Sequence, residues 1–178
     1  MVTLPASIAR LKAVRRFVLY GSWLVRIPPE IAEMESLESF EPYTSHRLHW
    51  FPYEITRCKN LKRSTVSTRS LYGNFKYRPP FPSLQPATTS AAALDLAHLT
   101  PAVWGVEAVA RCVVCGSSLT SAGLHQAWLS ALVATDVLPL LVSACSEECV
   151  RKLPLGAEGY VRTPHRGGPA VQQPPPDH

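Results

Sequence analysis

Charged residues are scarce in this chain of 178 residues, and the motifs of the common enzyme classes are missing. Only 17% of the residues are Asp, Glu, Lys or Arg, which is below the quarter usual in a globular domain, whereas the 17 prolines are about twice the usual share. No Ser/His/Asp order, paired carboxylates, Gly-rich phosphate loop or open metal site is apparent. We therefore expect part of the chain to be irregular, and we predict a protein that is not an enzyme and has no small-molecule substrate.

The sequence also lacks a secretion signal and a membrane-spanning segment. The stretch from Leu4 to Leu19 is interrupted by basic residues, and no apolar block leads to a small-residue cleavage site. The most apolar stretch, 127–144, contains Asp136 and Pro139, and we interpret it as a core helix followed by a core strand. The five cysteines are few and odd in number, which indicates a reducing compartment. We predict an intracellular protein, cytoplasmic or nuclear, with no membrane partner.

The net charge of +5 is distributed unevenly. Residues 1–78 hold 13 Lys/Arg and 6 Glu, whereas residues 79–178 hold 5 Lys/Arg and 7 acidic residues. The basic residues of the first half alternate with glutamates and form no cluster, so a nucleic-acid partner is not expected.

Three pairs of an apolar residue and proline divide the first half into repeats: Leu4-Pro5, Ile27-Pro28 and Phe51-Pro52 follow one another after 23 and 24 residues. After each pair, apolar residues recur at every third position, which is typical of one face of a short helical turn. These apolar ladders are Ile8, Leu11 and Val14; Ile31, Met34 and Leu37; and Ile55, Cys58 and Leu61. The spacing then changes to every second position, which predicts a short strand in each copy. Each copy is thus predicted to form one coil of a solenoid.

On these residues, the first half resembles the leucine-rich repeat family, in its short intracellular type and at the C-terminal end of an array. The resemblance implies an α/β solenoid of about three coils over residues 1–78, closed by a C-terminal cap. Where the family places an asparagine in the turn, this chain has Ser22, Ser45 and Arg69. The run from Ser64 to Asn74 and the prolines after it are similar to poorly characterised fungal repeat proteins that carry a C-terminal cysteine module.

The function that the resemblance implies is binding of a protein partner on the concave strand surface, as a scaffold or adaptor. We expect the contact residues at the exposed positions of the predicted strands, which are Arg16, Val18, Ser39, Glu41, Arg63 and Thr65. This prediction depends on an analogy of fold, and the sequence does not identify the partner.

Two close pairs of cysteines mark the second half: Cys112-Val-Val-Cys115, followed by Gly116, and Cys145-Ser-Glu-Glu-Cys149. Zn²⁺ prefers four ligands at tetrahedral corners, and two close pairs separated by a long insert can supply them. We predict that all four cysteines bind a structural Zn²⁺ in a module over residues 104–162. The module resembles a treble-clef zinc finger, although that family usually spaces its second pair by two residues.

Other interpretations of the cysteines stay open. The module can instead belong to a zinc-dependent nucleic-acid-binding or ubiquitin-system protein, or Cys112 and Cys115 can act as redox thiols. His125 lies between the pairs and is an alternative ligand, whereas Cys58 occupies an apolar repeat position and is assigned to the core. Residues 79–103 are rich in Pro, Ala, Ser and Thr and are predicted to be a linker, and residues 163–178 are predicted to be a disordered tail.

Overall fold

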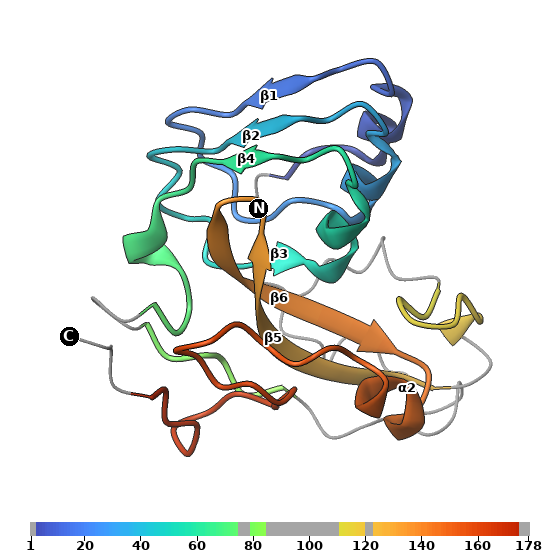
Figure 1. Ribbon diagram of the computed structural model, residues 1–178, viewed down its shortest axis with the longest axis vertical. Helices are drawn as coiled ribbons and strands as arrows, with labels where there is room; N and C mark the ends of the chain where they lie inside the picture. The colour runs from blue at the N-terminus through green and yellow to red at the C-terminus, as the bar shows by residue number, and fades with distance from the viewer. Residues whose placement is uncertain (1–2, 75–78, 85–110, 120–122, 175–178) are drawn as a thin grey trace.

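The computed structural model describes residues 3–74, 79–84, 111–119 and 123–174, and it shows short helices with two small three-stranded sheets (Figure 1). The elements are the 3-10 helices η1 (Ala6–Arg10), η2 (Pro29–Glu33), η3 (Tyr53–Arg57) and η4 (Thr68–Ser70), the strands β1 (Arg16–Val18), β2 (Ser39–Glu41), β3 (Phe51–Pro52), β4 (Arg63–Ser64), β5 (His125–Val133) and β6 (Asp136–Ala144), and the α-helix α2 (Glu147–Arg151). The fold is therefore mixed α/β, as predicted. Residues 85–103 of the predicted linker and 104–110 of the predicted cysteine module lie outside the described residues.

The first part of the chain consists of three similar units, over residues 4–26, 27–50 and 51–74. In each unit an extended proline, Pro5, Pro28 or Pro52, precedes a 3-10 helix of five residues. Proline suits this position because its ring fixes φ and the first helical turn needs no N–H donor from it. One isoleucine of each helix, Ile8, Ile31 and Ile55 in turn, is buried between the units. The three units thus bury one side of each short helix against the next unit.

Strands from the three units form a parallel sheet in the order β1-β2-β4. Arg16 pairs with Ser39, and Ser39 pairs with Arg63, so each step between strands covers 23 or 24 residues. This register equals the spacing of the apolar-proline pairs in the sequence. The strands lie one beside another, and the short helices follow one another along a second side of the molecule (Figure 1).

Serine hydroxyls hold the turns that follow the strands. Ser45 Oγ donates to the carbonyl of Leu19 at 2.9 Å, and the Ser22 N–H donates to Ser45 Oγ at 3.1 Å. In the third unit, Ser70 Oγ donates to the carbonyl of Leu48 at 3.3 Å. In the third turn this hydrogen bond therefore comes from Ser70, the neighbour of Arg69, which the repeat spacing places there.

The stretch 127–144 forms a β-hairpin, so the predicted helix before the strand is wrong. β5 pairs with β6 in antiparallel register from His125 with Ala144 to Val133 with Asp136. Both strands are largely buried on their two faces, and a continuous apolar run of this kind has no period that separates helix from strand. Among the described residues, no helix has the length and apolar character needed to cross a membrane.

The hairpin joins the three units directly, which differs from the predicted layout of two modules. β3 pairs in parallel with β6, with Phe51 opposite Leu140. The turn of the hairpin also reaches β4, because the Ser64 N–H donates to Thr135 Oγ1 at 3.1 Å and Thr135 Oγ1 donates to the Ser64 carbonyl at 2.8 Å. Val133, Leu138 and Leu140 of the hairpin belong to the same buried apolar cluster as the isoleucines of the units. The Thr135 side chain of the hairpin thus hydrogen-bonds to the open edge of β4. Edge strands have unpaired backbone groups that need such partners.

Residues 163–174 pack against the hairpin, so the predicted disordered tail is not observed there; residues 175–178 lie outside the described residues. The Trp128 N–H donates to the His165 carbonyl at 2.7 Å, and the Gly168 N–H donates to the Phe81 carbonyl at 2.9 Å. Gly167 has φ of 71°, and a Cβ at this position would lie 2.2 Å from the Pro82 carbonyl oxygen. Its lack of a side chain is what allows the segment to approach so closely.

Trp128 is the centre of a second apolar cluster. It is fully buried and its ring contacts those of Trp50, Tyr72 and Phe81, with centroids 6.0, 5.7 and 5.5 Å away. His165 packs edge-on against Phe81 at 4.7 Å, and burial lowers the pKa of its imidazole from 6.5 to about 4. The cluster therefore connects the second and third units, the hairpin and the C-terminal segment.

Candidate metal centre

The first cysteine pair lies in a tight loop of backbone hydrogen bonds. The Gly116 N–H donates to the Cys112 carbonyl at 3.0 Å, and the Cys112 N–H donates to the Ser117 carbonyl at 2.8 Å. Gly116 has φ of 76°, in the left-handed region that glycine adopts without strain. The loop thus turns Cys112 and Cys115 toward one point, as the sequence predicted.

The second pair lies at the junction of β6 and α2. Cys145 follows the last residue of the strand, and Cys149 lies in the first turns of the helix. Ser146 caps this helix, because its Oγ accepts a hydrogen bond from the Cys149 N–H at 3.2 Å. Glu147 and Glu148 occupy the first turn, where the helix dipole favours acidic side chains. The cap and the spacing of four residues place both thiols on the same side.

The four thiols converge. The sulfur atoms of Cys112, Cys115, Cys145 and Cys149 all lie within 4.8 Å of one another, and this group can hold a metal ion. Cys115 Sγ lies 3.4 Å from Cys145 Sγ, which lies 3.7 Å from Cys149 Sγ. A tetrahedron with Zn–S bonds of about 2.3 Å has sulfur–sulfur edges of roughly 3.8 Å. The thiol spacing therefore fits four-sulfur coordination.

The pKa values of Cys115 and Cys145 are shifted in opposite directions. Ser117 Oγ lies 3.2 Å from Cys115 Sγ, and hydrogen bonds with the Ser117 side chain and then its backbone lower the pKa of the exposed Cys115 thiol to about 6. The hydrogen bond with Cys115, together with burial, raises the pKa of Cys145 to about 12. Cys115 thus reaches the thiolate form that a metal ion binds at a lower pH than Cys145 does.

The other candidates lie outside the cluster. His125 is not part of it, and its Nδ1 faces Glu147 Oε2 at 3.5 Å. Cys58 is buried between the units, where its Sγ donates to the Ile31 carbonyl at 3.3 Å, and burial raises the pKa of its thiol to about 11. The assignment of Cys58 to the core is confirmed.

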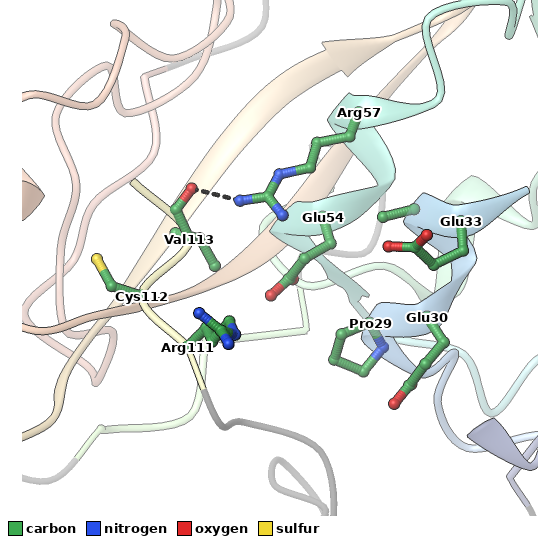
Figure 2. Close-up of a pocket in the computed structure, with 9 residues that line it drawn as sticks. Pro29, Glu30, Glu33, Glu54, Arg57, Arg111, Cys112 and Val113 are labelled. Carbon is green, nitrogen blue, oxygen red and sulfur yellow. Dashed lines mark hydrogen bonds between the residues drawn. The ribbon is translucent and has the colours of Figure 1, made fainter. Parts of the chain in front are cut away.

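A contact that the sequence does not indicate links the cysteine loop to the third unit. Arg57 Nη2, on η3, donates to the carbonyl of Val113 at 2.8 Å (Figure 2). Beside this bond lies a cavity of about 180 Å³ between η2, η3 and the loop, lined by Glu30, Glu33 and Glu54 among others. Burial raises the pKa of Glu54. The Arg57 bond places the main chain between Cys112 and Cys115 against the stacked units.

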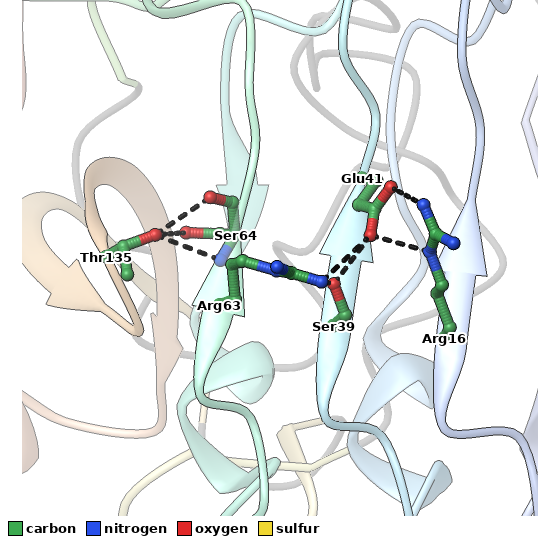
Figure 3. Close-up of polar contacts among 6 residues, drawn as sticks. All are labelled: Arg16, Ser39, Glu41, Arg63, Ser64 and Thr135. Atoms are coloured by element: carbon green, nitrogen blue, oxygen red, sulfur yellow. Dashed lines mark hydrogen bonds and ion pairs between the residues drawn. The ribbon is translucent and has the colours of Figure 1, made fainter.

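The predicted partner-binding residues lie side by side on β1, β2 and β4 and in the chain just after β4. Glu41 accepts from Arg16 through Nε and Nη2, both at 2.8 Å, and from Ser39 Oγ at 2.7 Å (Figure 3). Arg63 Nη2 lies 3.8 Å from the same carboxylate. Hydrogen bonds from Arg16 and then Ser39 lower the pKa of Glu41 to about 2. These four residues therefore form a network in which one carboxylate faces two guanidinium groups, which leaves a net positive charge.

The solvent exposure of the predicted contact residues differs from one to another. Ser39 is only 6% exposed, because its hydroxyl lies beneath the ion pair, so its prediction as an exposed contact is wrong. Val18 is 50% exposed, and Thr65 is exposed as well.

Exposed aromatic residues extend this surface, and the sequence interpretation missed them. Tyr20 and Tyr43 continue the alternation of β1 and β2 by one step, and their rings lie 5.9 Å apart. They are 67% and 47% exposed, and Trp23, at 68%, lies beneath the guanidinium of Arg47 at 4.8 Å. Continuing the two-residue period past Val18 and Glu41 would have identified the two tyrosines. We call the set Arg16, Val18, Tyr20, Glu41, Tyr43, Arg63 and Thr65 the strand face.

Comparisons with known proteins do not assign the chain to a family. No protein-family model matches it, and no curated protein matches it either.

Proposed function

We propose that this chain is a non-enzymatic scaffold or adaptor that binds a protein partner through the strand face. The observation that carries the proposal is the exposure of Val18, Tyr20 and Tyr43 on one side of the parallel sheet. Exposed aromatic residues in a contiguous patch are typical of protein-binding surfaces. The network around Glu41 would order the polar part of this surface before binding.

A short leucine-rich-repeat solenoid is the architecture that we propose for residues 4–74. It is supported by the repeat of 23 and 24 residues, by one short helix and one strand in each unit, and by the parallel register at the same step. Serine hydroxyls in the turns supply the hydrogen bonds that the family's asparagine would make. We also propose an intracellular location, which agrees with five free cysteines.

We further propose that the cysteine cluster binds one Zn²⁺ with a structural role. Cys112, Cys115, Cys145 and Cys149 would hold the ion, which would link the loop at 112–116 to β6 and α2. Four protein sulfurs complete a tetrahedral shell and leave no position for a reactive water, so the ion would stabilise the fold and not catalyse a reaction.

The interaction is tested by a photo-crosslinking amino acid placed at Val18, with the same group at Lys59 on the helical side as the matched control. Both positions are exposed, so neither replacement should disturb the core. A defined adduct at Val18 that is absent at Lys59, and whose purified partner binds less tightly to the Tyr20→Ala variant, supports the proposal. Equal adducts at both positions, or none, would contradict it.

The zinc proposal is tested by elemental analysis of the purified protein. We expect about one zinc per chain, lost in the Cys112→Ser/Cys145→Ser variant and kept in the Cys58→Ala control, because Cys58 lies outside the cluster. A folded protein without metal, in which Cys112 and Cys115 form a disulfide, would refute the zinc site and favour the redox alternative.

A further inference from the structure

A second cavity lies next to the strand face and has no role in the function proposed above. It has a volume of about 310 Å³ and lies between the turn after β2 and the chain that leads from β4 into η4. Its lining residues are Tyr43, Thr44, His46, Val66, Ser67, Thr68 and Arg69, and we call this cavity the anion pocket. Its volume is at the lower end of the range of ligand-binding sites.

The lining has donors and positive charge but no carboxylate. Arg69 and His46 supply N–H groups, and Ser67 and Thr68 supply hydroxyls, whereas the Thr44 hydroxyl already donates to the Tyr43 carbonyl at 2.7 Å. The carboxylate on the neighbouring part of the strand face, Glu41, is already held by Arg16 and Ser39. The pocket is therefore suited to a negatively charged ligand.

Two further observations set this pocket apart from an ordinary surface hollow. The Ser67 hydroxyl is buried and has no hydrogen-bond partner among the described residues, although a buried hydroxyl normally has one. Thr44 has φ of 60°, which is strained for a β-branched side chain, whereas the first unit has Gly21 at the matching position with φ of 62°. Strained residues and unsatisfied polar groups lower the stability of the folded state. They concentrate at binding sites, where their role in binding a ligand outweighs this cost.

We propose that the anion pocket binds a phosphate monoester, carried on a phosphorylated side chain of the protein partner. A phosphate monoester has a charge near −2 and three acceptor oxygens, so it can accept from a guanidinium and several hydroxyls together, whereas a carboxylate has two oxygens. A peptide source is favoured because Tyr43 belongs to both the pocket and the strand face, and Tyr20 lies beside it, so a bound chain can cross both. The proposal rests on the interaction function proposed above.

The test uses the purified full chain on arrays of randomised peptides, each present with and without one phosphorylated Ser, Thr or Tyr. Affinities of the selected peptides are then measured in solution for the wild type and for the Ser67→Ala, Arg69→Gln and Arg10→Gln variants. Arg10 is exposed on η1 and does not line the pocket, so Arg10→Gln controls for the loss of one positive charge. Phenyl phosphate, inorganic phosphate and a single-stranded oligonucleotide are titrated in parallel.

We expect phosphorylated peptides to bind roughly tenfold or more tightly than their unphosphorylated forms, since at least one charge-assisted hydrogen bond is gained. Ser67→Ala should remove most of this preference without lowering the thermal midpoint, because the hydroxyl has no partner within the described part of the chain. Arg69→Gln should weaken binding further, and Arg10→Gln should leave it unchanged.

The other outcomes contradict the proposal in distinguishable ways. Equal binding of both peptide forms, or an unchanged preference in Ser67→Ala, removes the pocket as a phosphate site. If phenyl phosphate binds as tightly as the peptides, the ligand is a small phosphate compound. If the oligonucleotide binds as tightly as the peptides, the ligand is a nucleic acid. Either result contradicts the proposal that a peptide carries the phosphate. A crosslinked partner at Val18 that binds regardless of phosphorylation leaves the interaction function standing and refutes only the pocket.

Discussion

Replacing Trp128 by alanine is expected to destabilise the stacked units as well as the hairpin that carries this residue. Trp128 is fully buried, contacts Trp50 of the second unit, and donates through Nε1 to the Pro82 carbonyl at 2.9 Å. Truncating a buried tryptophan costs about 3–5 kcal/mol, and the orphaned carbonyl adds about 1 kcal/mol. Since the free energy of unfolding of a whole domain is about 5–15 kcal/mol, this variant should lose a large share of its stability.

Urea unfolding of protein labelled with fluorotryptophan measures this effect at separate sites. The ¹⁹F signals of Trp23 and Trp50 report on the units, and far-UV circular dichroism reports on the whole chain. We expect one transition in the wild type and a common shift of all signals in Trp128→Ala, because β3 and β6 share a sheet and the two parts share a core. Trp128→Phe keeps a ring and should lose about 1–3 kcal/mol.

The control is Trp23→Ala, since Trp23 is 68% exposed and its removal should change the free energy of unfolding by no more than about 0.5 kcal/mol. If Trp23 and Trp50 keep their wild-type midpoint in Trp128→Ala while the rest of the chain unfolds earlier, the units fold independently. That result would refute the single shared core and restore the layout of two modules.

Three further predictions follow from individual contacts. The pKa of His165 is lowered from 6.5 to about 4 in the folded state, so the unfolded state binds its proton more tightly. With respect to this group, the free energy of unfolding should therefore be highest above pH 6.5 and should fall as the pH is lowered toward 4. The loss of unfolding free energy is at most about 3 kcal/mol, and about half of that after allowance for partial solvent exposure. The urea midpoint should depend less steeply on pH across this range in His165→Phe than in the wild type. An unchanged pH dependence would contradict the lowered pKa of His165. Thr44→Gly should raise the free energy of unfolding by about 1 kcal/mol, because it relieves the strain at φ of 60°; a loss of stability would show that no strain is present. Arg57→Ala removes the donor to Val113 and should weaken zinc binding by about tenfold in competition with a chromophoric chelator; unchanged affinity would mean that this contact does not support the metal loop.

The sequence by itself determined the features that depend on local spacing. The apolar-proline pairs determined where each short helix begins, because proline restricts its own φ and the start of a helix tolerates its missing N–H. The register of 23 and 24 residues between the strands follows from the same repeat. The two close cysteine pairs, with Gly116 and a helix start beside them, predicted the cluster because each half is organised by its own neighbours.

Only the tertiary structure decided how distant segments meet. The apolar stretch 127–144 has no distinguishing period, so its pairing as a hairpin and its contact with β3 depend on partners far away in the chain. The segment 163–174 has the composition of a disordered tail, yet the missing side chain of Gly167 lets it pack against Trp128 and Pro82. The two-residue alternation of the strand predicts that Ser39 is exposed, but the ion pair of Arg16 with Glu41 covers it. The spacing of residues in the sequence does not indicate this ion pair. Periodicity reports the face a residue occupies, whereas burial depends on what the rest of the chain places upon that face.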